Sequence, residues 1–397
     1  MPAPSERWIR LGPDCAPVPE RLLLAHARGQ VLLITGAGVS LPAGLPDFRQ
    51  LVLDVYRRLD TSTYAALSAT APGMQDEPPA STLLPPQQRA EVLRYMRGDY
   101  DVVLGMLERR LEGDPTGQSI VRNAVTARLR AGAPRPAAIH RAIMRLSDRG
   151  GAVAVVTTNF DDLLEAAVPR RARPQTYALG AIPRPTLRPE FDGVFHIHGA
   201  LAAHANRTSD LILTDQDFGE FYLRRRVVPD FIYDAARLFH LVLVGYSAND
   251  PPMRYLLNAV AADGARFSDL KERFTFFGAP PPADPVALDD WRGRGITPIP
   301  YDQADQHDEL RRTLDRWAEL SPINGARVTV DRTLRRMIRR PRHAATEADQ
   351  DLFDHLFRRS DHNERLRLAR LLGAAGADLG WLDAIAAVGR EPVGGGP

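Results

Sequence analysis

Four segments of this sequence share a pattern in which an apolar run stops and small or polar residues follow. The segments are Gly36-Ala37-Gly38, Thr158-Asn159-Phe160-Asp161, His196-Ile197-His198-Gly199 and Gly245-Tyr246-Ser247. An imidazole takes up a proton near pH 7, and an amide side chain offers a donor and an acceptor without adding charge. Paired glycines let the main chain approach an anion closely. These residue types together predict a site that handles a nucleotide.

The glycine turn follows the apolar run of residues 31–34. We expect that run to be a buried parallel strand that leads into a loop and a helix, whose backbone N–H groups face a phosphate. The N-terminus of that helix would add about half a positive charge. The turn lacks the third glycine of the dinucleotide-binding fingerprint and the lysine of a P-loop. Taken alone, it is also compatible with a tight strand-to-helix turn that binds no ligand.

The elements that must position these segments alternate along the chain. Apolar runs without polar alternation predict strands covered on both faces, at residues 31–34, 152–156, 193–197, 211–213, 241–244, 274–277 and 296–300. Helical patterns lie among them, and the alternation predicts an α/β fold with a doubly wound, Rossmann-like parallel sheet. The carboxyl ends of parallel strands form the ligand crevice in such sheets. The four polar segments should therefore meet there.

Two helical regions flank this predicted sheet. Residues 51–147 read as a large helical insertion between two strands, and its apolar stripe must be buried as a lid over the ligand or in an oligomer interface. After residue 320 the character shifts to an Arg-rich segment followed by two or three helices. We therefore expect a catalytic domain over residues 1–320 and a helical C-terminal region over residues 321–397 that is a candidate for partner docking.

The composition bounds the class of protein. The chain has 397 residues, 44% of them hydrophobic, and a net charge of +2, which gives no global field that would favour nucleic acid or a membrane. No apolar run approaches the roughly 18 residues that span a bilayer, and the N-terminus lacks a secretory pattern. Cys15 is the only cysteine, which excludes an intramolecular disulfide and a four-cysteine zinc site. We expect a cytoplasmic protein that needs no metal.

Arginine accounts for nearly all the basic residues, since Lys271 is the only lysine. Such a uniform preference for arginine indicates the composition of the genome. Clusters of arginine are therefore weak evidence for phosphate recognition in this chain. The arginine run at residues 327–342 is accordingly interpreted as a solvated face. Binding of nucleic acid or an acidic partner remains the alternative.

The motifs together resemble one protein family. Gly36-Ala37-Gly38, Pro46-Asp47-Phe48-Arg49, Thr158-Asn159-Phe160-Asp161, His198-Gly199 and Gly245-Tyr246-Ser247 occur in the order and spacing of the sirtuins. The chain most resembles the bacterial sirtuin-like NAD hydrolases of antiviral defence systems, over about residues 18–302. The resemblance implies that NAD is the substrate. Because an enzyme that depletes NAD would poison its host unless it were held inactive, we also expect a homo-oligomer or a defence-system partner that opens the site.

The same resemblance implies roles for individual residues. Asn159 would hold the ribose or the attacking water, and His198 would be the base. Asp161 would accept from the nicotinamide carboxamide. The remaining cofactor-binding candidates are the phosphate cradle of Gly36, Ala37 and Gly38, the loop residues Asp47, Phe48 and Arg49 over the nicotinamide ribose, Thr158 beside the asparagine, and Gly245 and Ser247 on the opposite side.

Departures from the family point to water as the acceptor. Sirtuin deacylases carry a zinc ribbon of four cysteines and a glutamine before the asparagine, whereas this chain has one cysteine and Thr158. The polar stretch at residues 202–210 is too short for a zinc module. Breaking the nicotinamide–ribose bond passes through an oxocarbenium-like state with a leaving group that is already cationic. A base is therefore needed, but no general acid.

Other interpretations stay open at this point. Asn159 is also a suitable helix cap, Asp161 a suitable first-turn charge, and His196 a hydrogen-bonded structural histidine on the same strand face as His198. NAD-dependent deacylation or ADP-ribosyl transfer is the alternative activity. A module that binds NAD or ADP-ribose without turnover is the alternative of another class.

Overall fold

The computed structural model describes residues 6–112, 119–201, 211–246 and 270–390. Within this part of the chain, seven parallel strands form one sheet in the order β5-β6-β4-β3-β7-β8-β9. They are β3 (Val31–Thr35), β4 (Ala154–Thr157), β5 (Thr176–Ala178), β6 (Gly193–His196), β7 (His240–Val244), β8 (Arg273–Ala279) and β9 (Thr297–Asp302). A small antiparallel pair, β1 (Trp8–Arg10) and β2 (Pro17–Pro19), precedes them. The predicted doubly wound parallel sheet is confirmed.

The strand order places a topological switch beside β3. From β3 the chain continues to β4 and to the edge strand β5, places β6 between those two, and then crosses to β7 on the other side of β3. Register pairs Thr35 with Thr157 on one side and with Val244 on the other. Ligands of open α/β sheets bind in the crevice at such a switch, outside the carboxyl ends of the strands.

Helices cover both faces of the sheet because side chains of β3 point alternately to opposite sides. Val31 and Leu33 join a core with α1 (Glu20–Ala27), α7 (Ala138–Ser147) and α13 (Ala304–Leu320). Leu32 and Ile34 join the core of the other face with α10 (Val227–Leu238) and α12 (Pro285–Gly293). Every residue of β3 is buried, as a central strand between two helical layers requires.

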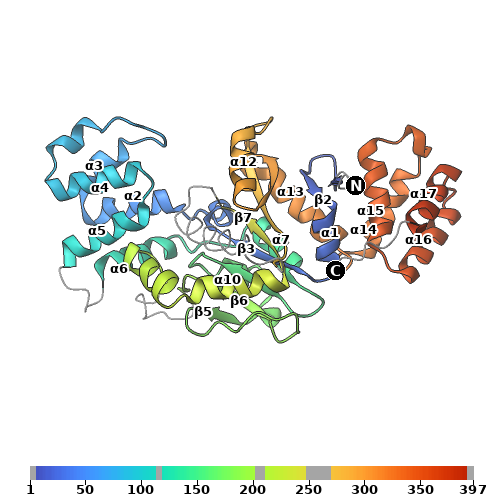
Figure 1. Ribbon diagram of the computed structural model, residues 1–397, viewed down its shortest axis with the longest axis horizontal. Helices are drawn as coiled ribbons and strands as arrows, with labels where there is room; N and C mark the ends of the chain where they lie inside the picture. The colour runs from blue at the N-terminus through green and yellow to red at the C-terminus, as the bar shows by residue number, and fades with distance from the viewer. Residues whose placement is uncertain (1–5, 113–118, 202–210, 247–269, 391–397) are drawn as a thin grey trace.

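The helical insertion has a core of its own. It contains α2 (Phe48–Leu59), α3 (Thr61–Ser68), α4 (Pro86–Met96), α5 (Tyr100–Glu112) and α6 (Ile120–Arg130). Gly98, with φ +79°, breaks the helical pattern between α4 and α5. Figure 1 shows these helices at one end of the molecule. Helix α7, which lies inside the sequence range assigned to the insertion, packs against β3 and β4 instead.

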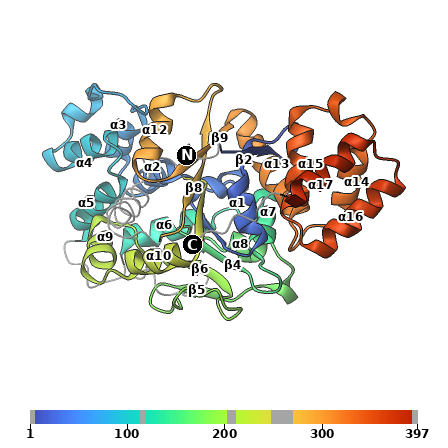
Figure 2. The ribbon, with the colours of Figure 1, turned by 45° about the vertical axis from the view of Figure 1, so that its right-hand side comes forward.

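The C-terminal helices lie at the opposite end, in the view of Figure 1 and again in that of Figure 2. They are α14 (Arg327–Met337), α15 (Glu347–Arg358), α16 (His362–Ala374) and α17 (Leu379–Arg390). Phe353 and Trp381 form their buried centre, which continues into the core under the sheet. The indole N–H of Trp381 donates to the carbonyl of Arg340 at 2.8 Å.

Several short elements connect these layers. Helix α8 (Leu163–Ala166) follows β4, and α9 (Asp215–Phe218) continues into a single π-helical turn, η6 (Gly219–Arg224). The short 3₁₀ turns are η1 (Ala37–Val39), η2 (Leu41–Ala43), η3 (Pro79–Leu83), η4 (Arg170–Ala172) and η7 (Arg342–Ala344).

Two local predictions were wrong. Residues 211–213 form no strand, because the N–H of Ile212 bonds to the carbonyl of His198 and that of Leu213 bonds to the carboxylate of Asp217. No α-helix begins directly after the glycine turn either: η1 and η2 intervene, and α2 starts only at Phe48. The partial positive charge of an α-helix N-terminus, which was expected beside the glycines, is therefore absent at that point.

Candidate functional site

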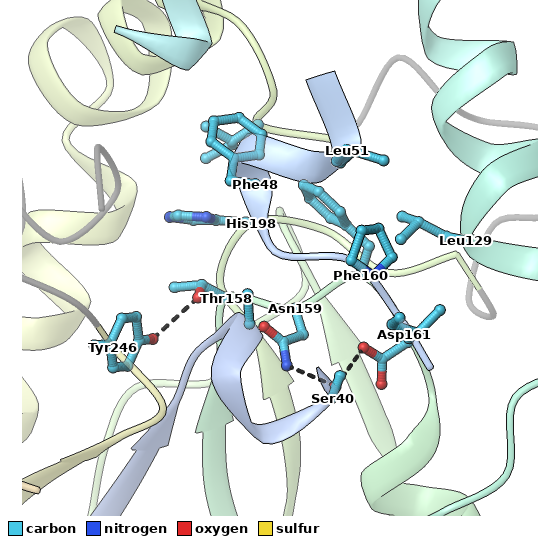
Figure 3. Close-up of a pocket in the computed structure, with 14 residues that line it drawn as sticks. Ser40, Phe48, Leu51, Leu129, Thr158, Asn159, Phe160, Asp161, His198 and Tyr246 are labelled. Atoms are coloured by element: carbon cyan, nitrogen blue, oxygen red, sulfur yellow. Dashed lines mark hydrogen bonds between the residues drawn. The ribbon is translucent and has the colours of Figure 1, made fainter. Parts of the chain in front are cut away.

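Two adjoining pockets lie at the carboxyl ends of the sheet strands, and the smaller one is shown in Figure 3. They contain about 650 and about 1460 Å³ of space free of protein atoms, solvent at their mouths included. Ala37, Phe48 and Tyr246 line both pockets. Thr158, Asn159, Asp161 and His198 line the smaller one, and Gly38, Asp47, Arg49 and Gly245 line the larger one.

Asn159 is held at the floor of the smaller pocket in one orientation. Its Nδ2 donates to the carbonyl of Gly36 and to Ser40 Oγ, both at 3.1 Å. A carbonyl only accepts hydrogen bonds, so the amide nitrogen must lie on that side. The amide oxygen is therefore on the opposite side of the group, where it can accept a hydrogen bond from a ligand. Figure 3 shows the nitrogen turned toward Ser40.

Asp161 is linked to Asn159 through Ser40. Ser40 Oγ donates to Asp161 Oδ2 at 2.9 Å, and the N–H of Leu163 donates to Oδ1 at 3.1 Å. Burial raises the pKa of Asp161, and these two hydrogen bonds oppose that rise. Helix α8 begins after its N-cap residue Asp162, which makes no side-chain cap bond, and the N–H of Leu163 is bound by Asp161 and not by Asn159. The alternative of Asn159 as a helix cap is therefore not what the structure shows.

His196 supports Asn159 from beneath. Its Nδ1 donates to the carbonyl of Asn159 at 2.9 Å, and its Nε2 donates to Glu165 Oε1 at 3.0 Å. Both partners accept, so both ring nitrogens carry a proton when Glu165 is ionised. Although full burial lowers it, the pKa of His196 is raised by Glu165, and the bond to His196 lowers the pKa of Glu165. His196 is thus the structural histidine of the pair.

His198 lies beyond the end of β6 in very different surroundings. Its Nε2 is 2.6 Å from the hydroxyl of Tyr222, and its ring meets those of Phe218 and Tyr222 edge-on. Burial lowers the pKa of His198 to about 3. The imidazole is therefore neutral at physiological pH and retains one nitrogen that can accept a proton.

The three glycines of the site are required for contact between two loops. The N–H of Gly36 bonds to the carbonyl of Val244, and that of Gly38 bonds to the carbonyl of Gly245, both at 2.9 Å. A Cβ on Gly36 would lie 2.6 Å from the Tyr246 ring, and one on Gly38 would lie 2.9 Å from Gly245. Gly245 itself has φ +76°. Phosphate binding through the N–H groups of Gly36 and Gly38 would require these loop bonds to open.

Thr158 bonds to the neighbouring loop. The hydroxyl of Tyr246 donates to the carbonyl of Thr35 at 2.8 Å and lies 3.0 Å from Thr158 Oγ1. Thr158 Oγ1 also lies 3.4 Å from the carbonyl of Thr35, so the two hydroxyls and this carbonyl form one hydrogen-bonded cluster in which either hydroxyl can donate to the other. The two residues thereby fix the wall between the ends of β4 and β7.

The segment from Asp47 to Arg49 begins α2 and covers the larger pocket. Asp47 caps the helix by accepting from the N–H of Gln50 at 2.7 Å. The Arg49 guanidinium donates to the carbonyl of Thr70 at 2.8 Å and stacks on the ring of Tyr95. Both side chains therefore have structural partners in addition to their place in the pocket wall.

Sequence reasoning named most of this site but missed some of its residues. Ser247 lies outside the described residues. Ser40, Tyr222 and Tyr246 were not selected, although Tyr246 belongs to a motif that carried the resemblance and Ser40 follows the glycine turn by two residues. Leu51 and Leu129 also line the smaller pocket from the insertion, and no local pattern in the sequence singles out these two residues.

No cluster of three residues suited to hold a metal ion occurs in the described ranges. Among the helices of those same ranges, none has the length and apolar character needed to cross a membrane.

Comparisons with known proteins agree with the motifs at the coarse level. Residues 153–299, which extend from β4 into β9, match the model of the SIR2-like domain. The chain is also 36% identical over 305 residues to the uncharacterized protein y4cA of Sinorhizobium fredii (strain NBRC 101917 / NGR234). That alignment covers 75% of this chain and 23% of the relative, so the chain spans about a quarter of the relative's length. The SIR2-like match supports the sirtuin-like resemblance and, with it, the binding of NAD.

Proposed function

We propose that the protein is an NAD⁺ hydrolase that cleaves the nicotinamide–ribose bond and releases nicotinamide and ADP-ribose. The observation that carries the proposal is that Asn159 and His198, from separate strand ends, line one pocket beside the glycine turn. The SIR2-like match supports the choice of NAD. The deacylase and ADP-ribosyltransferase alternatives gain no support from a specific feature of the site.

The shape of the site suits a ligand with two halves. Two pockets that share Ala37, Phe48 and Tyr246 can hold the two ends of one dinucleotide. We assign the nicotinamide riboside half to the smaller pocket, with Asn159 and His198. The adenosine half then occupies the larger pocket, and the pyrophosphate passes the shared wall at Ala37.

The proposed reaction needs positioning more than it needs strong acid or base chemistry. The C1′–N bond breaks and its electron pair goes to the ring nitrogen, which neutralises the pyridinium charge. Water then forms a bond to C1′ and loses one proton, so the products are nicotinamide, ADP-ribose and H⁺. Because the oxocarbenium-like carbon is highly electrophilic, attack by water tolerates a weak base.

Each residue then has a defined task. The Asn159 amide oxygen accepts a hydrogen bond from a ribose hydroxyl or from the attacking water. His198 takes the proton of that water and passes it to solvent. Phe48, Leu51 and Leu129 exclude bulk water from the reacting carbon.

Product analysis tests this function. Purified protein is incubated with NAD⁺, alone and with proteins encoded beside it, and nicotinamide and ADP-ribose are quantified by chromatography. We expect both products in equal amounts, and Asn159→Ala should reduce their formation by about 10²-fold or more. Deacylated peptide or ADP-ribosylated protein without free ADP-ribose would instead favour the transferase or deacylase alternative. Tight NAD⁺ binding with no product under every condition would contradict hydrolysis.

We further propose that the activity depletes NAD⁺ in antiphage defence. This part rests on the resemblance to the defence branch. An enzyme that would poison its own cell must be held inactive, so we propose that homo-oligomer assembly or a partner docked on the C-terminal helices opens the site.

A further inference from the structure

Tyr222 is the direct hydrogen-bond partner of His198. The hydroxyl oxygen lies 2.6 Å from His198 Nε2, and the two side chains are 3% and 1% exposed. Phe218 packs against both rings, with centroids 5.7 Å from His198 and 5.3 Å from Tyr222. A bond this short between two buried rings leaves His198 little freedom to rotate.

The fold holds Tyr222 in this place through an unusual turn. Tyr222 lies in the π-helical turn η6, a local irregularity that often occurs at functional sites. Asp217, just before that turn, accepts from the N–H groups of Leu213 and Thr214. Arg122 of α6 donates to both oxygens of Asp217, at 2.9 and 2.7 Å. The insertion thereby anchors the turn that carries Tyr222.

We propose that Tyr222 is a positioning residue that accepts a hydrogen bond from His198 Nε2–H and so reserves Nδ1 as the proton acceptor. The inference rests on the proposed hydrolase function. A neutral imidazole carries one proton on its two nitrogens, and the nitrogen without it is the base. A tyrosine that holds the proton on Nε2 leaves the lone pair of Nδ1 for the attacking water.

The partner differs in charge from that of His196. Glu165 favours an imidazolium at His196, whereas Tyr222, whose pKa burial raises well above its ordinary value, is neutral. A neutral partner fixes the tautomer without stabilising the protonated ring. His198 can therefore release its proton after each turnover.

Tyr222→Phe tests the role of the hydroxyl, because the ring and its contacts remain. Protein labelled with ¹⁵N-histidine is examined by long-range ¹H–¹⁵N NMR, and His198→Ala assigns the signal. The wild type should show the Nε2–H tautomer, and Tyr222→Phe should show a mixture or the Nδ1–H form. For NAD⁺ hydrolysis we expect kcat to fall about 10-fold or more with KM nearly unchanged, a smaller loss than the ~10²–10⁴-fold of a deleted base.

Tyr56→Phe is the matched control. Tyr56 is also fully buried and its hydroxyl donates to Glu91 at 2.9 Å, but it lines neither pocket. This variant should keep the wild-type tautomer of His198 and the wild-type kcat. An equal loss of kcat in both variants would mean that any buried hydroxyl matters, and would overturn the proposal.

The NMR readout separates this inference from the proposed function. An Nδ1–H tautomer in the wild type, or the same tautomer in the wild type and Tyr222→Phe, overturns the positioning role whether or not NAD⁺ is hydrolysed. Absence of hydrolysis by the wild type overturns the proposed function, while the tautomer result still decides what Tyr222 does to His198. A raised KM at constant kcat in Tyr222→Phe also overturns the proposal, because it assigns the hydroxyl to substrate binding.

Discussion

Two histidines at the end of β6, separated by one residue, have opposite surroundings. His196 lies in the floor of the site, bonded to Glu165 and to the carbonyl of Asn159. His198 lies in the wall among aromatic rings, bonded to Tyr222. Full burial is common to both, yet it leaves one imidazole with a raised pKa and the other with a lowered one. The difference teaches that the partner of a buried histidine, not its burial, decides its charge.

The backbone explains why neighbours diverge so sharply. Strand β6 ends at His196, and the chain turns at Gly199, which has φ +91°. His198 is therefore outside the ladder, and the period-two rule that would place both rings on one face no longer applies. The His196 ring bonds to Glu165 and to the carbonyl of Asn159, whereas the His198 ring bonds to Tyr222 of η6.

The largest expected effect of changing either histidine is on turnover, and it should come from His198. His198→Ala removes the proposed base and should lower kcat for NAD⁺ hydrolysis by ~10²–10⁴-fold. The fold should persist, because the loss is confined to one wall of the pocket. Circular dichroism and steady-state assays of nicotinamide release measure both properties. A wild-type kcat in His198→Ala would mean that His198 is not the base.

The second-largest expected effect is a loss of stability, and it should result from changing His196. His196→Ala leaves Glu165 as a buried carboxylate without its cationic partner, so the free energy of unfolding should fall by about 3–5 kcal/mol. Urea denaturation of this variant and of His198→Ala provides the direct contrast. A smaller loss in His196→Ala than in His198→Ala would show that the ion pair is not what holds the floor.

The pH dependence of stability should have opposite signs for the two residues. The folded-state pKa of His198, about 3, lies below its ordinary value of 6.5, so only the unfolded chain gains a proton as the pH falls below 6.5. Its contribution to stability is thus lost on acidification, by up to about 1.4 kcal/mol per pH unit. The pKa of His196 is raised, so its contribution is complete below pH 6.5 and is lost as the pH rises through the folded-state value.

His198→Gln and His196→Gln isolate these two contributions from the other buried histidines. Unfolding free energies are measured from pH 4 to pH 9 and subtracted from those of the wild type. The stability difference between the wild type and His198→Gln should grow with pH, and the difference for His196→Gln should shrink above pH 6.5. Parallel curves would mean that the two rings share one environment.

The smallest effect should come from Ser40, which links Asn159 to Asp161. Ser40→Ala removes one of the two acceptors that orient the Asn159 amide, and the bond to Gly36 remains. Loss of one such bond costs about 1 kcal/mol, which predicts a fall in kcat of roughly 5-fold. Ser147→Ala is the control, because that serine is buried in α7 and lines neither pocket. Equal kcat values in the two variants would mean that Ser40 does not help to orient Asn159 for the reaction.

The sheet was predictable from the sequence because its signal is local. The apolar runs of β3, β4 and β7 show no polar alternation, and the residues that follow them belong at the switch point by topology alone. The three-residue strand β5 was not predicted, since so short a segment shows no hydrophobic periodicity.

The prediction for the glycine turn was partly wrong, because no α-helix follows the turn directly and the glycines serve a contact between loops. Gly36 and Gly38 are small because Tyr246 and Gly245 pack against them, and a sequence does not show contacts between distant loops.

By itself, the sequence determined which residue types gather at the strand ends and in which order, because strand length, glycine position and polar endings are properties of neighbouring residues. Only the tertiary structure decided which histidine is paired with a carboxylate and which has a neutral aromatic partner. The reason is that Glu165 and Tyr222 lie 31 and 24 residues away from the rings they contact. Charge and tautomer depend on such partners, and folding alone brings them within hydrogen-bonding distance.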